Sequence, residues 1–200
     1  MNDDAITGFV ESRWEESILP ALREYIRIPN KSPAFDDRWA EHGHMDAAAR
    51  LLQAWTERVD IRGLRHEIVA LPGRTPVLFC EIDASNGAGA DAPCVLLYGH
   101  YDKQPEFDGW EEGLSPWQPV DRDGKLYGRG GADDGYALFA SLTAIEALQR
   151  QGIAHCRCVV LIEGCEESGS FDLPFYVEHL RGRIGNPQLC LLYTSDAADE

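Results

Sequence analysis

The sequence has no hydrophobic run long enough to span a bilayer, no excess of basic residues and no segment ordered like a signal peptide. Lys and Arg number 18 against 34 Asp and Glu, so the formal net charge is -16. Such a charge repels nucleic acids and anionic membranes, so neither is expected as a partner. The first residues, Met1-Asn2-Asp3-Asp4, are acidic, whereas a signal peptide begins with a basic region. We therefore expect a cytoplasmic protein.

Several catalytic and binding signatures are also missing. Cys156 and Cys158 form a Cys-x-Cys pair, but no second pair completes a zinc cage, and the six cysteines are predicted to be reduced thiols. No Gly-x-Ser-x-Gly motif of a serine hydrolase occurs. The stretch GRGGAD (128–133) lacks the third glycine of a dinucleotide-binding loop. These absences disfavour a structural zinc module, a serine nucleophile and a nicotinamide enzyme.

The apolar residues alternate between helical and strand-like patterns along the chain. Helical spacing covers residues 6–28, 38–58 and 134–151, and a shorter helix is expected at 172–180. Strand-like runs cover 64–70, 76–82, 94–98 and 157–162, and another strand begins at 188–189. Residues 103–131 are rich in loop signals, and a turn rich in Gly, Ala and Asn is expected at 85–93. The alternation predicts an α/β fold with a largely parallel central sheet flanked by helices.

Three polar clusters follow predicted strands or open a predicted helix. They are His100 with Asp102, Asp133 with Asp134, and Glu166 with Glu167. The spacing is 33 residues from His100 to Asp133 and 34 from Asp133 to Glu167, about one βα unit each. The three clusters are therefore predicted to converge at one end of the sheet. A strand followed by an ordinary polar turn is the alternative interpretation of the His100 segment.

Convergent carboxylates point to a metal. In a partly dry site they repel one another unless cations neutralise them. One imidazole with carboxylates suits Zn²⁺, and also Mn²⁺ or Co²⁺. A hydrolytic site with two ions needs a bridging carboxylate, terminal ligands, a water and a base that takes its proton. Of two adjacent glutamates, one could bind a metal ion and the other could take the proton from the water.

Three motifs resemble those of peptidase family M20 in order and spacing. They are GHYDKQP (99–105), LYGRGGADDGYALFASLTAIEAL (126–148) and VLIEGCEESGS (160–170). This family includes carboxypeptidase G, carnosine-type dipeptidases, acetylornithine deacetylase and succinyl-diaminopimelate desuccinylase. The resemblance covers most of residues 15–189, and the first motif is most similar to the dipeptidase branch. Gly135-Tyr136 stands where many relatives have Lys-Gly.

The resemblance implies a site with two Zn²⁺ ions and a role for each residue of the clusters. His100 and Glu167 would each bind one ion, and Asp133 would bridge the two. Asp102 would fix the imidazole of His100, and Glu166 would be the general base. The family also implies a cis peptide bond between Asp133 and Asp134.

The resemblance further implies parts that this sequence lacks. The family needs an aspartate after the next strand, a distant histidine, and a lid and dimerisation domain that would make the full-length protein a homodimer. Residues 190–200 resemble the translation of a sequencing-library adapter, so Asp196 is not counted as a ligand. We expect residues 1–189 to be the N-terminal part of the catalytic domain, and the 200-residue chain to be inactive alone.

The predicted function is metal-dependent hydrolysis of an amide bond in a dipeptide or at a C-terminal residue, with water activated by Glu166. The first alternative is an N-acyl amino-acid deacylase, because these motifs serve the chemistry and not the substrate pocket. A second alternative is an inert relative that uses the fold for binding. A third alternative is a related dizinc aminopeptidase, which uses the same kinds of metal ligands. The His-Tyr-Asp-x-Gln-Pro loop does not favour this alternative.

Overall fold

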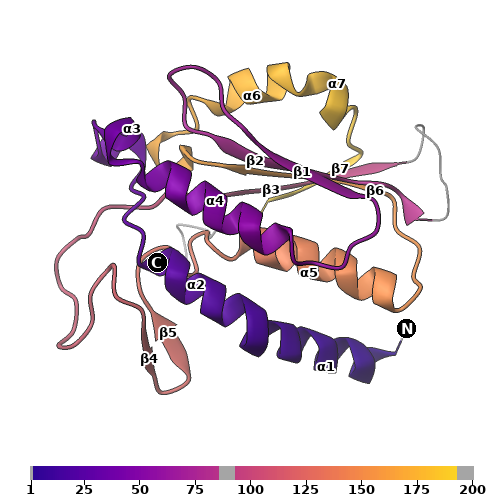
Figure 1. Cartoon of the computed structure of the whole chain (residues 1–200), viewed down its shortest axis with the longest axis horizontal. Coiled ribbons are helices and arrows are strands. Elements are labelled where there is room, and N and C mark those ends of the chain that lie inside the picture. Colours follow the sequence, from indigo (N-terminus) through magenta and orange to yellow (C-terminus); the bar gives the residue numbers. More distant parts are fainter. Residues whose placement is uncertain (1, 86–92, 193–200) are drawn as a thin grey trace.

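A five-stranded sheet forms the centre of the computed structural model, which describes residues 2–85 and 93–192 (Figure 1). The strands lie in the order β1-β2-β6-β3-β7. Their bounds are β1 (Leu64–Val69), β2 (Val77–Ile82), β3 (Cys94–His100), β6 (Arg157–Glu163) and β7 (Leu189–Leu192). Strands β6, β3 and β7 pair in parallel, and β2 pairs antiparallel with both β1 and β6. Only β2 runs against the others, so the predicted largely parallel sheet is confirmed.

Helices cover both faces of this sheet (Figure 1). One face carries α1 (Asp3–Arg13), the π-helical turn η1 (Trp14–Ile18), α2 (Leu19–Ile26), α4 (His44–Thr56) and α5 (Ala137–Arg150). The other face carries α6 (Leu173–His179) and α7 (Arg181–Ile184). The larger core lies between the sheet and the first group, where Trp55 meets Phe139 edge-on at 4.7 Å between ring centres. The smaller core packs Tyr176, Leu180 and Ile184 on the opposite face. Strand β6 is therefore buried on both faces, as its continuous apolar run predicts, whereas all four residues of the edge strand β7 are exposed.

Two predicted helices are interrupted. The helix expected at 6–28 spans α1, η1 and α2, and the one expected at 38–58 is divided into α3 (Trp39–His42) and α4. The division falls at Gly43, whose φ of 70° ends one helix and begins the next. Glycine adopts this left-handed conformation at little cost, which explains the break. Apolar spacing did not report the break, because the buried residues of the predicted helix all lie in α4 and α3 has none.

The loop-rich stretch 103–131 contains a hairpin that the apolar pattern did not predict. Strands β4 (Val120–Arg122) and β5 (Lys125–Tyr127) pair antiparallel across Asp123 and Gly124. These two residues have φ of 53° and 74°. An Asp-Gly pair between short strands is a strong hairpin signal, so the sequence did contain the information. The hairpin projects away from the central sheet (Figure 1).

Parts of two sequence predictions lie outside the described residues. These parts are positions 86–92 of the expected turn at 85–93 and positions 193–200 of the segment expected to be foreign, including Asp196. Cys190, Leu191 and Leu192 of that segment lie in β7. Within residues 2–85 and 93–192, no helix has both the length and the apolar character needed to cross a bilayer.

Candidate metal centre

The three predicted polar clusters meet at the carboxyl ends of β3 and β6 and before the first turn of α5. His100 is the last residue of β3, and Asp133 lies four residues before α5 begins. Glu166 and Glu167 open the short turn η4 (Glu166–Ser168), just after β6. Ligand atoms of His100, Asp133 and Glu167 all lie within 4.8 Å of one another. These three form the one such cluster of potential metal ligands in the described part of the chain, and we call it the ligand triad.

The two nitrogens of His100 face different carboxylates. Nε2 lies 3.3 Å from Asp133 Oδ1 and 3.6 Å from Glu166 Oε2. Nδ1 lies 3.4 Å from Asp102 Oδ1 and 3.2 Å from the Asp102 carbonyl oxygen. Because Asp102 holds Nδ1, Nε2 is the nitrogen that is available to a metal ion beside Asp133. This arrangement is what a histidine ligand requires from its surroundings.

Asp102 also holds the turn that carries the two glutamates. Its Oδ1 accepts the backbone N–H of Glu166 at 3.1 Å, and its Oδ2 accepts that of Glu167 at 3.0 Å. The side chain is completely buried. A single carboxylate therefore fixes the His100 ring and η4 together. The alternative of an ordinary polar turn after β3 does not account for these contacts.

Asp133 and Asp134 turn in different directions. Asp134 is buried, and its Oδ2 accepts the backbone N–H of His100 at 3.1 Å. Asp133 is 36% exposed and faces His100. The peptide bond between them is cis, as the family resemblance implies. Close packing helps to place them, since a Cβ at Gly99 would lie 2.5 Å from Ala137 Cβ and 2.7 Å from Asp134 Oδ2.

The protonation equilibria of these groups reflect crowded negative charge. Burial raises the pKa of Glu167 to about 7 and that of Asp134 to about 8, and it also raises the pKa of Glu166. Burial alone would lower the pKa of His100, but hydrogen bonds to Asp102 and Asp133 outweigh it and raise that pKa to about 11. Protons thus supply the positive charge that the carboxylates need. A bound cation would supply it instead and release protons.

The donor set and one orphaned oxygen fit a metal ion. Glu167 Oε2 accepts the side-chain amide of Gln104, whereas Oε1 is buried and has no hydrogen-bond partner among the described residues. A buried carboxylate oxygen without a partner is costly unless something else neutralises it. One imidazole and two carboxylates suit Zn²⁺, Mn²⁺ or Co²⁺. The residues present therefore fit a divalent metal.

Comparisons with known proteins identify the family of the chain. The sequence model of peptidase family M20/M25/M40 matches residues 96–193. A cysteinylglycine-S-conjugate dipeptidase of Corynebacterium striatum is 38% identical over 180 residues, covering 86% of this chain and 36% of that protein. A beta-Ala-His dipeptidase of Mus musculus is 36% identical over 172 residues, covering 80% of this chain and 33% of that protein. The chain belongs to peptidase family M20.

Other relatives widen the range of activities within M20. A succinyl-diaminopimelate desuccinylase of Nitrosospira multiformis is 37% identical over 83 residues, covering 40% of this chain and 21% of that protein. The crystal structure of human carnosine dipeptidase 1 has a TM-score of 0.69 and 26% identity to this chain, covering 96% of it and 41% of that structure. The M20 chain spans about a third of the length of the two dipeptidases.

Several residues of this M20 site escaped the sequence analysis. Gln104 belongs to the quoted GHYDKQP stretch, so its position beside Asp102 was the available signal for its contact with Glu167. Ser168 Oγ contacts Ser32 Oγ at 2.5 Å and accepts the N–H of Ala34 at 2.8 Å. Nothing in the sequence near residue 32 indicated this contact, because it joins segments more than 130 positions apart.

Proposed function

We propose that this chain is the N-terminal part of a dizinc peptidase that hydrolyses the amide bond of dipeptides or of C-terminal residues. The observation that carries the proposal is the ligand triad, assembled from three distant segments with a buried, unpartnered oxygen on Glu167. Such an arrangement of negative groups is costly in a protein that binds no cation.

Each residue of the site has one proposed task. His100 and Glu167 would each hold one ion, and Asp133, which has a ligand atom within 4.8 Å of those of the other two, would hold both. When bound, divalent ions polarise a substrate carbonyl and lower the pKa of water. Asp102 would keep Nδ1 of His100 occupied, so that Nε2 stays available as a ligand.

Glu166 is the proposed general base. It sits beside the triad, with Oε2 at 3.6 Å from His100 Nε2, and it is one-third exposed toward the solvent from which a water would come. Its carboxylate would accept a proton as the water oxygen bonds to the amide carbon. The same proton would pass to the nitrogen as the carbon–nitrogen bond breaks. The raised pKa brings Glu166 closer to the range in which it can take and return a proton near neutral pH.

The dipeptidase assignment rests on the two relatives that match most of the chain. The desuccinylase match favours an N-acyl amino-acid deacylase as the second candidate, over a shorter stretch. Three features stay predictions: the foreign origin of residues 190–200, dimerisation of the full-length protein, and inactivity of the 200-residue chain alone.

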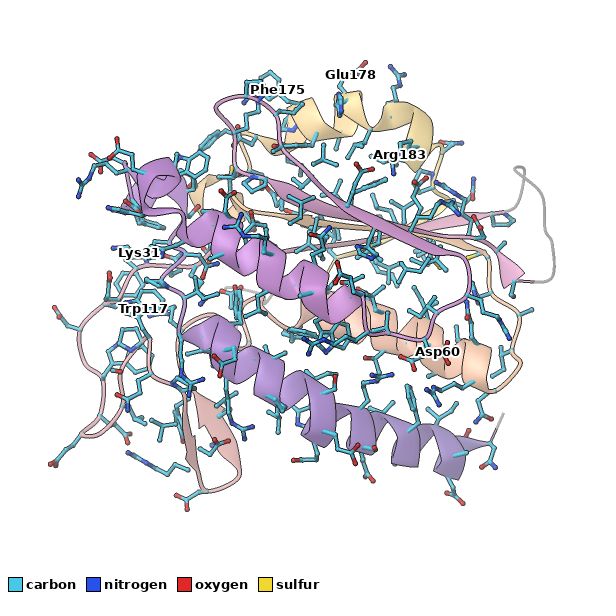
Figure 2. The ribbon with its side chains drawn as sticks, in the orientation of Figure 1. Lys31, Asp60, Trp117, Phe175, Glu178 and Arg183 are labelled. Carbon is cyan, nitrogen blue, oxygen red and sulfur yellow. The ribbon has the colours of Figure 1, made fainter. Side chains whose placement is uncertain are left out.

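The test separates metal binding from catalysis. Zn²⁺ binding to the 200-residue chain is measured by calorimetry for wild type, His100→Ala, Glu166→Gln and Glu178→Gln. Glu178 lies on α6, far from the triad, with an exposed carboxylate, and serves as the matched control (Figure 2). We expect His100→Ala to weaken Zn²⁺ binding strongly, and the two glutamine variants to bind almost as wild type does.

Activity is measured on the protein expressed from the complete gene, with dipeptides and N-acyl amino acids as substrates. Glu166→Gln should lower kcat by about 10²–10⁴-fold, the usual contribution of a positioned base, and Glu178→Gln should leave it unchanged. Full activity of Glu166→Gln would refute the assignment of the base. Turnover of N-acyl amino acids but not of dipeptides would select the second candidate.

A further inference from the structure

Lys103 is a buried lysine with an unusual set of partners. Its side chain is fully buried, and it takes part in no ion pair in the part of the chain that the structure describes. Nζ donates hydrogen bonds to the carbonyl oxygens of Tyr25 and Ile28, each at 2.8 Å. It also lies 4.0 Å from the centre of the Tyr25 ring and 5.5 Å from that of Trp117. Burying an ammonium group is costly, so these contacts must compensate for the water that it loses.

The Tyr25 carbonyl lies in the last turn of α2, which ends at Ile26, and the Ile28 carbonyl lies two residues beyond that end. The last carbonyl groups of a helix have no partners inside the helix, and the helix dipole makes that end attractive to a lysine. Lys103 supplies a further donor at this end of α2 from a segment 75 or more positions away, beside the Ile28 N–H that the Tyr25 carbonyl also accepts. It therefore ties α2 to the loop that follows β3, three residues after His100. Figure 2 shows Lys31 and Trp117 on this side of the molecule, near the end of α2.

The aliphatic part of Lys103 supports the loop that leads to Asp133. A Cβ at Gly130 would lie 2.6 Å from Cε, 2.8 Å from Cγ and 2.9 Å from Cδ of Lys103. The backbone of Gly130 thus rests directly on the lysine chain. The Gly130 carbonyl in turn accepts the N–H of Gly135 at 2.9 Å, which closes the turn containing Asp133. The Lys103 side chain therefore packs against the turn that contains Asp133.

The backbone of Lys103 reaches the third segment of the site. Its N–H donates to the Asn30 carbonyl at 3.1 Å, and its carbonyl accepts the N–H of Ser32 at 3.0 Å. Ser32 contacts Ser168, the last residue of η4, through their side-chain oxygens. Lys103 therefore follows the strand that ends at His100, contacts the turn that contains Asp133, and is linked to the turn that carries Glu167 through Ser32.

We propose that Lys103 is a positioning residue of the metal centre, which sets the separation of Asp133 from His100 through its cap on α2 and its contact with Gly130. The inference rests on the proposed function, since it requires the triad to bind a divalent metal. It also goes beyond that function, because Lys103 itself offers no ligand atom to the triad.

The test uses Co²⁺, whose visible absorption reports both the affinity and the geometry of its ligands. Lys103→Met keeps a side chain of similar length and removes the N–H donors. The exposed Lys125, at the start of β5, gives the matched control Lys125→Met. Leu142→Ala, at a fully buried position on α5, gives a variant destabilised without any change at Lys103. Unfolding curves of the metal-free proteins define the folded fraction of each.

Lys103→Met should weaken Co²⁺ binding by about tenfold or more and change its absorption band, as loss of a supporting contact does at metal sites. Lys125→Met should bind Co²⁺ with the affinity and the absorption band of wild type. The folded molecules of Leu142→Ala should do the same, once the unfolded fraction is subtracted. If Lys103→Met does not fold, Lys103→Gln, with a shorter chain that keeps a donor, decides by the same comparison.

The inference and the proposed function fail in different ways. Wild-type affinity and an unchanged band in the lysine variant would overturn the positioning role while leaving the metal site intact. Absence of Co²⁺ binding in wild type, or equal binding by His100→Ala, would instead refute the metal site itself.

Discussion

Replacing Asp102 tests the central structural element of the site. Its two oxygens accept the backbone N–H groups of Glu166 and Glu167, and it is fully buried. In Asp102→Ala both N–H groups lose their acceptor inside the protein. Each such loss costs about 1–3 kcal/mol, so the free energy of unfolding should fall by about 2–6 kcal/mol. Asp102→Asn keeps one acceptor oxygen and directs an amide toward the other N–H, so its loss should be smaller but still above about 1 kcal/mol.

The free energies are measured by urea unfolding of the chelator-treated protein, and Zn²⁺ affinity by calorimetry. If Asp102→Ala does not fold, Asp102→Asn carries the test. Zn²⁺ affinity of Asp102→Asn should fall by about 10–100-fold, because a neutral amide orients the His100 ring less strongly than the carboxylate does. The control is Asp83→Ala, which breaks an exposed pair with Arg65 and should change stability by less than about 1 kcal/mol. Equal stability and Zn²⁺ affinity in Asp102→Asn and wild type would refute the reasoning.

Three further predictions concern protons, metal and packing. Burial raises the pKa of Asp134 from 3.8 to about 8, so the folded chain retains a proton that the unfolded chain releases. The free energy of unfolding of metal-free wild type should therefore fall by up to about 1.4 kcal/mol per pH unit from this group as pH rises from about 4 to 8. Asp134→Asn should not show this slope in urea titrations. Zn²⁺ should raise the melting temperature by an amount that is larger at pH 8 than at pH 6, because the ion competes with the proton on His100, and an equal shift at both pH values would contradict this. Gly135→Ala should destabilise the protein by more than about 1 kcal/mol, because the new Cβ would overlap the Gly130 carbonyl, whereas Gly182→Ala meets nothing within 4 Å and should not destabilise it.

Local pattern was enough to predict most of the secondary structure. Helix α5 and strands β3 and β6 lie where apolar spacing placed them, because each buries residues at the period of its own geometry. The failures were local too: the break at Gly43 and the hairpin across Asp123-Gly124 depend on backbone conformations that hydrophobic spacing does not report.

The candidate site was predictable as a set of residues but not as a structure. The sequence by itself determined which polar groups follow strands or precede a helix, and the motif spacing indicated that His100, Asp133 and Glu167 belong together. The roles proposed for them remain predictions for experiment to test.

Only the tertiary structure decided which groups support that site. Three contacts join segments that are distant in the sequence. They are the antiparallel pairing of β2 with β6, the hydrogen bonds of Asp102 to η4, and the hydrogen bond of Lys103 to the end of α2. A residue's own neighbours determine its helical or strand tendency, but its hydrogen-bond partners across the fold depend on how the layers pack. For that reason the position of Lys103 within the GHYDKQP motif did not indicate its role. Its hydrogen bonds to Tyr25 and Ile28 are visible only in the tertiary structure.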